Sequence, residues 1–210
     1  MNNMQKSATI LIPDISGFTE LFSKTELEFS TGILCELLNE LIRVADDDFR
    51  VAEIEGDAIL FYITGKKLSI DELVRYCLRA YIHFHKYLIK VIARVEDAAA
   101  REAAEQLDIK FIAHYGPIAE INISNFFKPV GLPLIQAHYL LKNSIESDAY
   151  ILITEEFADG QELPEGEASW PESLQWRKGS EEYPVIGTIN YYYTLLETSE
   201  TTRAVNVSKA

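Results

Sequence analysis

The chain has 210 residues, of which 48% are hydrophobic and 25% charged, a composition typical of one globular domain with a substantial core. Its formal net charge is −14, so its surface repels phosphate backbones and anionic lipid headgroups, which argues against nucleic-acid and membrane partners. No apolar run reaches the ~20 residues that cross a bilayer, and the first residues, MNNMQKS, do not resemble a signal peptide. Two cysteines, Cys35 and Cys77, lie in apolar helical patterns typical of buried reduced thiols, and we expect a cytoplasmic protein.

In the first half of the chain, apolar runs and helical spacing alternate. Residues 8–13 predict a buried strand that ends at an acidic turn, followed by a short helix from Phe18 and a longer one over 30–45. Residues 49–54 and 58–64 flank a Gly-Asp turn and predict a hairpin. A helix is predicted from a capping box of Ser69 and Glu72 to about Arg94. The alanine-rich segment after it either continues that helix or forms a separate one.

The second half predicts more strand. Residues 109–123 indicate one or two strands hinged at Gly116-Pro117, and 132–145 a helix, followed by a strand over 149–154. The acidic segment 158–182 is expected to be a loop with one strand near Trp176. A strand pair over 183–187 and 189–197 closes the domain.

This order predicts an α+β fold with a ferredoxin-like βαββαβ core and a C-terminal β-hairpin. We expect a single domain over residues 1–197 and a disordered polar tail over 198–210.

Two carboxylates stand out in this arrangement. Asp14 ends the first strand and Asp57 lies in the hairpin between the second and third, so both can converge at one end of the sheet. Two carboxylates there would suit Mg²⁺ or Mn²⁺, which bind one or two carboxylates together with phosphate oxygens. The alternative is that Asp14 caps a helix and Asp57 only makes a turn.

Five short motifs in order carry a resemblance to the class III adenylate and guanylate cyclases. The residues that resemble the cyclase motifs are Asp14-Ile15-Ser16-Gly17-Phe18-Thr19, Glu53-Ile54-Glu55-Gly56-Asp57-Ala58, His114-Tyr115-Gly116-Pro117, the segment 131–140, and Val185-Ile186-Gly187. The chain also resembles a group of bacterial proteins that carry a degenerate cyclase domain.

The resemblance implies roles for the retained residues. Asp14 and Asp57 would hold the metal with the Ile15 carbonyl, and the phosphates would contact Gly17, Phe18 and Thr19. It also implies a head-to-tail homodimer in which each site takes its metal ligands from one subunit and its base-reading and transition-state groups from the other.

Three positions depart from the cyclase pattern. The family's asparagine corresponds to Ile135, its transition-state arginine to Tyr139 and its phosphate-binding lysine to Ile186. Phosphoryl transfer depends almost wholly on positioning and charge stabilisation, so these replacements should nearly abolish cyclase activity in a homodimer. Lys142 or Asn143 would substitute if both lay on the same helix face as Ile135 and Tyr139; the alternative is that they face solvent or cap the helix.

The positions that read the base in the family are occupied by Glu53 and Lys128. Either they read a base edge, or they pair with each other and fill an empty pocket. Among the histidines, His83 and His85 point to different faces of one helix, His114 is expected in the core, and His138 stands alone.

The sequence therefore favours a non-catalytic cyclase-homology protein that binds a metal–nucleotide (a nucleoside triphosphate or a cyclic nucleotide) or a partner protein. An alternative is an active or atypical nucleotide cyclase, including the metal-donating half of a heterodimer with a complementary cyclase. A third is a structural domain in which the aspartates have no function.

Overall fold

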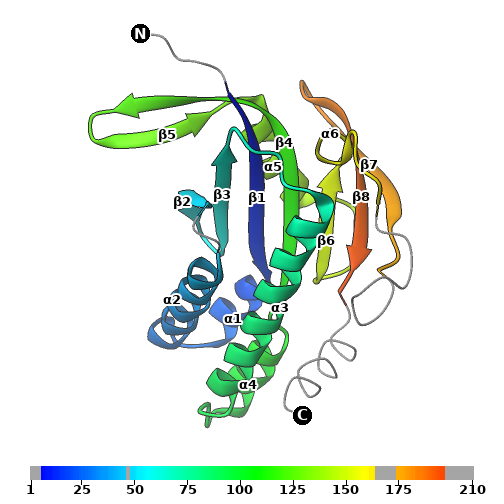
Figure 1. The fold of residues 1–210 in the computed structure, drawn as a ribbon. Helices are drawn as coiled ribbons and strands as arrows, with labels where there is room; N and C mark the ends of the chain where they lie inside the picture. The colour runs from blue at the N-terminus through cyan, green and yellow to red at the C-terminus, as the bar shows by residue number, and fades with distance from the viewer. Residues whose placement is uncertain (1–5, 46–47, 164–173, 197–210) are drawn as a thin grey trace, which may run out of the picture.

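The computed structural model describes residues 6–45, 48–163 and 174–196, and in these residues eight strands form one sheet with helices on both faces (Figure 1). The strand order is given by β2 (Arg50–Glu55), β3 (Ala58–Thr64), β1 (Lys6–Ser16), β4 (Asp108–Ile123), β6 (Tyr150–Thr154), β8 (Gly187–Leu195) and β7 (Arg177–Tyr183). A further strand, β5 (Phe126–Val130), pairs with the far end of β4 as a projecting hairpin (Figure 1).

The first four strands of this order, β2-β3-β1-β4, are antiparallel to their neighbours. This is the strand order of a ferredoxin-like βαββαβ core, so the predicted α+β fold is confirmed. β6 extends the sheet parallel to β4, and β8 and β7 add the C-terminal hairpin.

The helices divide between the two faces of the sheet. The bounds are α1 (Phe18–Lys24), α2 (Leu27–Val44), α3 (Ile70–Ile92), α4 (Ala98–Glu105), α5 (Leu132–Tyr139) with a 3₁₀ turn η1 (Leu140–Lys142), and α6 (Glu155–Ala158). α2 and α3 cover one face and α5 the other (Figure 1). The predicted capping box starts α3: Ser69 Oγ accepts from the Glu72 N–H at 3.1 Å, and the Ser69 N–H donates to Glu72 Oε2 at 2.8 Å.

The alternation of β1 builds two cores. Leu11 and Ile15 join the cluster that includes the buried residues of α2 and α3, whereas Ile10 and Ile12 join the cluster under α5. Asp14 has the same parity as Ile10 and Ile12, so its side chain faces the α5 side of the sheet. This parity, fixed by the apolar pattern, decides which face can carry a site.

Several predicted boundaries are wrong. The helix over 132–145 ends as an α-helix at Tyr139, and the strand predicted over 183–187 is the turn between β7 and β8. Of the one or two strands that residues 109–123 predicted, the structure has one, β4, which runs through Gly116; β5 was not predicted. The alanine-rich segment forms the separate helix α4. The expected polar tail over 198–210 lies outside the described residues.

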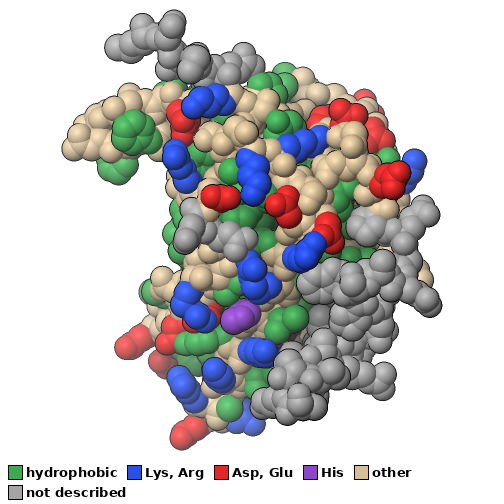
Figure 2. All heavy atoms as spheres, viewed as in Figure 1, with side chains coloured by type: hydrophobic (Ala, Val, Ile, Leu, Met, Phe, Trp, Pro, Cys, Tyr) green, Lys and Arg blue, Asp and Glu red, His purple; other side chains and the backbone are tan. Residues whose placement is uncertain are grey.

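Among the described residues, no helix is long and apolar enough to cross a membrane. Figure 2 shows Lys and Arg side chains interspersed with Asp and Glu on the face that α3 covers. The net negative charge is therefore not gathered on this face.

Candidate metal and phosphate site

Asp14 lies near the end of β1, directly opposite Lys110 on β4. The Lys110 ammonium lies 3.1 Å from Asp14 Oδ2, and the two side chains are only 14% (Asp14) and 19% (Lys110) exposed. From β4, the ammonium also donates to the Leu141 carbonyl in the segment after α5, at 3.4 Å. Sequence reasoning missed Lys110; the signal was a charge within the apolar run 109–113, at the register position opposite Asp14.

Asp57 approaches the same end of the sheet from the β2–β3 turn. Its carbonyl accepts from the Ile15 N–H at 3.2 Å, which ties the turn to β1. Burial raises the pKa of the Asp14 carboxyl, Lys110 opposes this change, and the negative charge of Asp57 adds to it. The negative charge of Asp57 therefore acts on the Asp14 carboxyl, and the Lys110 ammonium offsets it.

Tyr150 on β6 forms the side of this site next to β4. It is buried, and burial raises the pKa of its hydroxyl to about 12, with further contributions from the negative Asp14 and Asp148. The hydroxyl accepts a 2.6 Å hydrogen bond from Asn143 Nδ2. Tyr150 thus stays protonated at neutral pH and keeps a hydroxyl hydrogen to donate.

Asn143 is committed to local structure. Its Nδ2 also donates to the Leu140 carbonyl at 2.7 Å, and its Oδ1 accepts from the Ile145 N–H at 2.9 Å. Because α5 ends at Tyr139, neither Lys142 nor Asn143 continues the helix face of Ile135. Of the two roles considered for these residues, Asn143 therefore has the capping role, and neither residue substitutes from the face of Ile135.

The turn after β1 is held in a conformation that requires glycine. Gly17 has φ 83°, and a Cβ there would lie 2.9 Å from the Gln106 carbonyl oxygen. Phe18 is buried and packs edge-on against Phe22, while Thr19 is exposed at the start of α1. Only the backbone of Phe18, together with Gly17 and Thr19, is therefore available to a phosphate, and this role stays a prediction.

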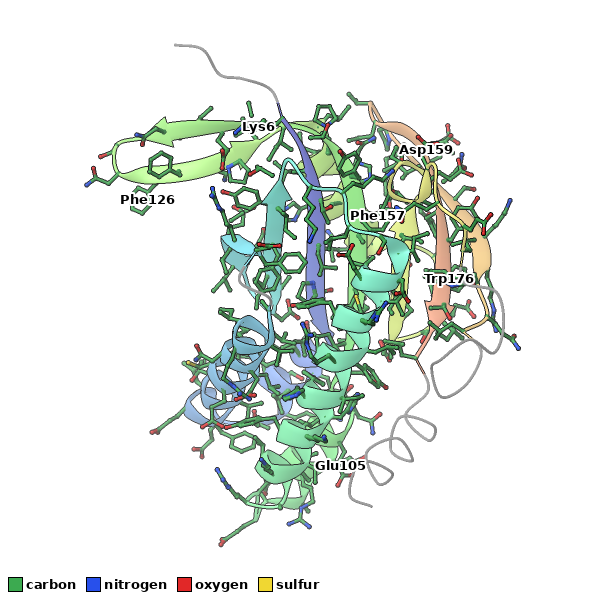
Figure 3. The ribbon with its side chains drawn as sticks, viewed as in Figure 1. Lys6, Glu105, Phe126, Phe157, Asp159 and Trp176 are labelled. Carbon is green, nitrogen blue, oxygen red and sulfur yellow. The ribbon has the colours of Figure 1, made fainter. Side chains whose placement is uncertain are left out.

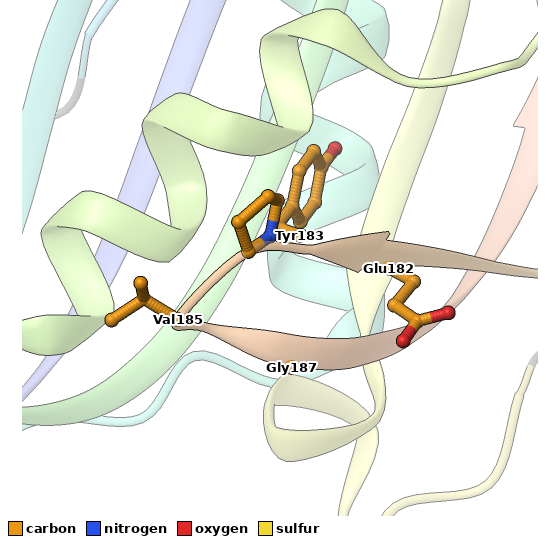
Figure 4. Close-up of a pocket in the computed structure, with 5 residues that line it drawn as sticks. Glu182, Tyr183, Val185 and Gly187 are labelled. Atoms are coloured by element: carbon orange, nitrogen blue, oxygen red, sulfur yellow. The ribbon is translucent and has the colours of Figure 1, made fainter.

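The three positions that depart from the cyclase pattern are mainly apolar surface. Ile135 is 49% exposed and Tyr139 43% exposed on α5, and Ile186 is half-buried in the β7–β8 turn. Tyr183 at the end of β7 is directed toward α5 (Figure 4); its hydroxyl donates to the Tyr139 carbonyl at 2.9 Å. This aromatic contact fixes α5 against the C-terminal hairpin without placing a positive charge there.

Glu53 and Lys128 meet at a second location, between β2, β5 and α5. Lys128 Nζ lies 3.2 Å from Glu53 Oε2, so the two side chains pair with each other. They line a cavity of about 230 Å³ together with His138, whose Nε2 lies 3.3 Å from Glu53 Oε1. His138, expected to stand alone, therefore belongs to this cluster.

His114 has a structural role. His114 is buried, with Nδ1 2.7 Å from Thr154 Oγ1 and Nε2 3.2 Å from Gln136 Oε1. Burial lowers its pKa, and Glu156 partly opposes this. The core location predicted for His114 is confirmed.

With this geometry in view, the family of the chain can be stated. Residues 34–150 match the model of a family described as a protein of unknown function, DUF2652. The chain belongs to the DUF2652 family. One relative by sequence is an uncharacterized protein of Mycobacterium tuberculosis, Rv2561/Rv2562. It is 28% identical over 173 residues, which make up 82% of this chain and 77% of that protein.

The fold of this DUF2652 chain is that of nucleotide cyclase catalytic domains. The guanylyl cyclase Cya2 matches with a TM-score of 0.64 at 15% identity, covering 94% of this chain and 97% of that one. The guanylate cyclase domain of RhGC from Catenaria anguillulae, in complex with GTP, matches with a TM-score of 0.58 at 19% identity, covering 92% of this chain and 99% of that one. A bacterial light-regulated adenylyl cyclase matches with a TM-score of 0.63 at 13% identity. The match covers 99% of this chain, which spans only 58% of the length of that cyclase.

Proposed function

We propose that this DUF2652 chain is a cyclase-homology domain that holds a divalent cation and the phosphates of a nucleotide at Asp14 and Asp57 without completing cyclisation. On this proposal it is a nucleotide- or partner-binding signalling protein. The observation that carries it is the convergence of two carboxylates and one ammonium, those of Asp14, Asp57 and Lys110, at one end of the sheet.

The donor set fits Mg²⁺ or Mn²⁺. Both ions prefer carboxylate and phosphate oxygens, and the partly buried Asp14 carboxylate carries a raised pKa that a nearby cation would reverse. Lys110 occupies only Oδ2 of Asp14 and reaches the site from β4. The cation would neutralise phosphate charge, which the acidic chain alone repels.

The lack of turnover is supported by the other half of the site. Ile135 and Ile186 have no hydrogen-bond donor in their side chains, and Tyr139 offers only a neutral hydroxyl. Loss of one preorganised donor commonly costs about 10²–10³ in rate, and three positions are affected. The amide of Asn143, a candidate substitute, is engaged with Tyr150 and Leu140.

A second candidate is an atypical cyclase, or the metal-donating half of a heterodimer. Lys110 favours it, because this ammonium supplies one positive group beside the metal ligands. A complementary cyclase would then provide the asparagine, arginine and lysine that this chain lacks.

A homodimer is supported by apolar side chains that the single chain leaves exposed. Phe126 and Phe127 are 77% and 73% exposed near the tip of the β4–β5 hairpin, which extends away from the body of the sheet (Figure 3). Ile123, Leu132 and Ile135 add exposed apolar surface on β4 and α5. Exposed apolar patches of this kind mark association surfaces.

The experiment is to incubate the purified chain with each nucleoside triphosphate and Mn²⁺ and to analyse the products by mass spectrometry. Calorimetry of the same mixtures measures binding. The proposal expects binding without cyclic product. Cyclic product from the unmodified chain would favour the second candidate, and Lys110→Met would then be expected to abolish it.

A further inference from the structure

A separate cluster lies at the cavity between β2, β5 and α5, which Glu53 and His138 line and which Glu55 adjoins on the exposed side. Glu53 and Glu55 are on β2 and His138 is on α5, and one donor atom from each lies within 4.8 Å of the other two. His138 Nε2 is 3.3 Å from Glu53 Oε1, and its Nδ1 is 3.7 Å from Glu55 Oε2. The cluster thus joins two elements that are far apart in the chain, since 83 positions separate Glu55 from His138.

A bulge in β2 creates this arrangement. The register shifts between Val51 and Glu53, so that Val51 pairs with Phe61 of the α2/α3 core whereas Glu53 pairs with Leu60 of the α5 core. Without the extra residue, Glu53 would share the face of Val51. The bulge therefore turns Glu53, and with it Glu55, toward His138 on α5.

We propose that Glu53, Glu55 and His138 form a binding site for Zn²⁺ or a transition-metal cation of similar preference. One imidazole and two carboxylates are donors that Zn²⁺ accepts. A tetrahedral ion about 2.0–2.1 Å from its donors holds them about 3.3 Å apart, the separation of Glu53 Oε1 and His138 Nε2. Glu55 is 75% exposed, so its carboxylate is free to turn onto the ion.

The surroundings leave room for the ion. The cavity of about 230 Å³ beside Glu53 and His138 is large enough for several water molecules, at about 30 Å³ each, which would complete the coordination. Lys128 contacts Glu53 through Oε2, whereas His138 faces Oε1, so the ammonium does not occupy the oxygen that the ion requires. Its positive charge nevertheless opposes a cation nearby, and its removal should strengthen binding.

This site differs in donor chemistry from the Asp14 and Asp57 pair. The latter offers only oxygen and suits Mg²⁺ or Mn²⁺, whereas His138 adds the nitrogen that favours Zn²⁺. The inference does not rest on the proposed function, because neither Asp14 nor Asp57 contributes a donor to it.

The test is calorimetric titration of the metal-free full chain with Zn²⁺ in excess Mg²⁺, with Co²⁺ absorption as a readout of coordination. We expect one tight Zn²⁺ per chain. His138→Gln and Glu55→Gln should each weaken it by at least about tenfold, since even residues behind the ligands contribute that much. Lys128→Met should tighten it.

Two control variants define the site. His83→Gln removes an imidazole on α3, and Asp57→Asn removes a carboxylate of the other site; both should bind Zn²⁺ like the unmodified chain. Glu55→Gln changes an exposed side chain, so a loss of affinity there is not a loss of folding. Equal Zn²⁺ affinity in the unmodified chain, His138→Gln and Glu55→Gln would overturn the proposal. No Zn²⁺ binding by the unmodified chain would overturn it as well.

Discussion

The two halves of the cyclase-like site have different surfaces. At the end of β1 and β4, Asp14 and Lys110 form a partly buried charged pair that Asp57 approaches. At α5 and the β7–β8 turn, Ile135 and Tyr139 present exposed apolar and aromatic side chains instead. A partly buried carboxylate with a raised pKa is costly to keep, whereas an exposed isoleucine costs little. This contrast is what the proposed function expects of a chain that binds a cation at one half of the site and lacks charge-stabilising groups at the other.

The largest expected effect comes from restoring that half. The triple variant Ile135→Asn, Tyr139→Arg and Ile186→Lys should produce cyclic nucleotide with Mn²⁺ where the unmodified chain gives none above background. Each restored donor is worth about 10²–10³ in rate. Mass spectrometry of the products measures it. Adding Asp57→Asn to the triple variant should remove the product; product that persists would show that Asp57 has no part in the site.

A second test concerns the apolar hairpin tip. Changing Phe126 and Phe127 together to Ser should convert a homodimer to monomer, because buried aromatic anchors at an interface contribute about 2 kcal/mol or more, a weakening of about thirtyfold. Light scattering at micromolar concentration gives the mass. Leu27→Ser, which alters an equally exposed apolar residue on α2, is the control and should remain dimeric. A monomeric unmodified chain would contradict the dimer.

The backbone geometry of the Gly17 turn after β1 gives a smaller effect. Gly17→Ala should lower the free energy of unfolding by about 1–3 kcal/mol, because φ is 83° and the new Cβ would contact the Gln106 carbonyl. Gly32→Ala is the matched control: it lies inside α2 with no atom within 4 Å of a Cβ, and should stabilise by up to about 1 kcal/mol. Denaturant unfolding measures both. Equal effects would mean that the Gly17 turn is not constrained.

The smallest effect is a pH dependence from His114. Burial lowers its pKa in the folded chain from the ordinary 6.5, so the unfolded chain binds more protons as pH falls below that value. The contribution of neutral His114 is therefore complete above pH 6.5 and decreases as pH falls toward the lowered pKa. Unfolding curves across this range should show the loss, and His114→Gln should show less of it. An identical slope in both proteins would assign it to other groups.

The sequence predicted the sheet and most helices because their signals are local. Apolar alternation in β1 and the capping box of α3 are readable from neighbouring residues. The β4–β5 hairpin was not predicted because its turn has no glycine; the residue with a positive φ there is Ser124. α5 was overextended because the apolar pattern continues through Leu140 and Leu141, where the backbone tightens to a 3₁₀ turn.

The candidate site divides in the same manner. Asp14 and Asp57 follow from motif and strand order, both readable in the chain. Lys110 and His138 were missed because their roles depend on register and on packing between distant segments: Lys110 opposite Asp14, and His138 against a bulged strand. Such neighbours are set by tertiary structure rather than by spacing.

The most direct test of the central claim is a thermal unfolding experiment with Mn²⁺ and a nucleoside triphosphate. A ligand at 100 times its dissociation constant that binds only the folded chain adds about 2.7 kcal/mol. The account predicts a raised melting temperature for the unmodified chain and for the control Asp71→Ala, and no shift for Asp14→Ala or Asp57→Ala. An equal shift in all four proteins would contradict the retained cation site.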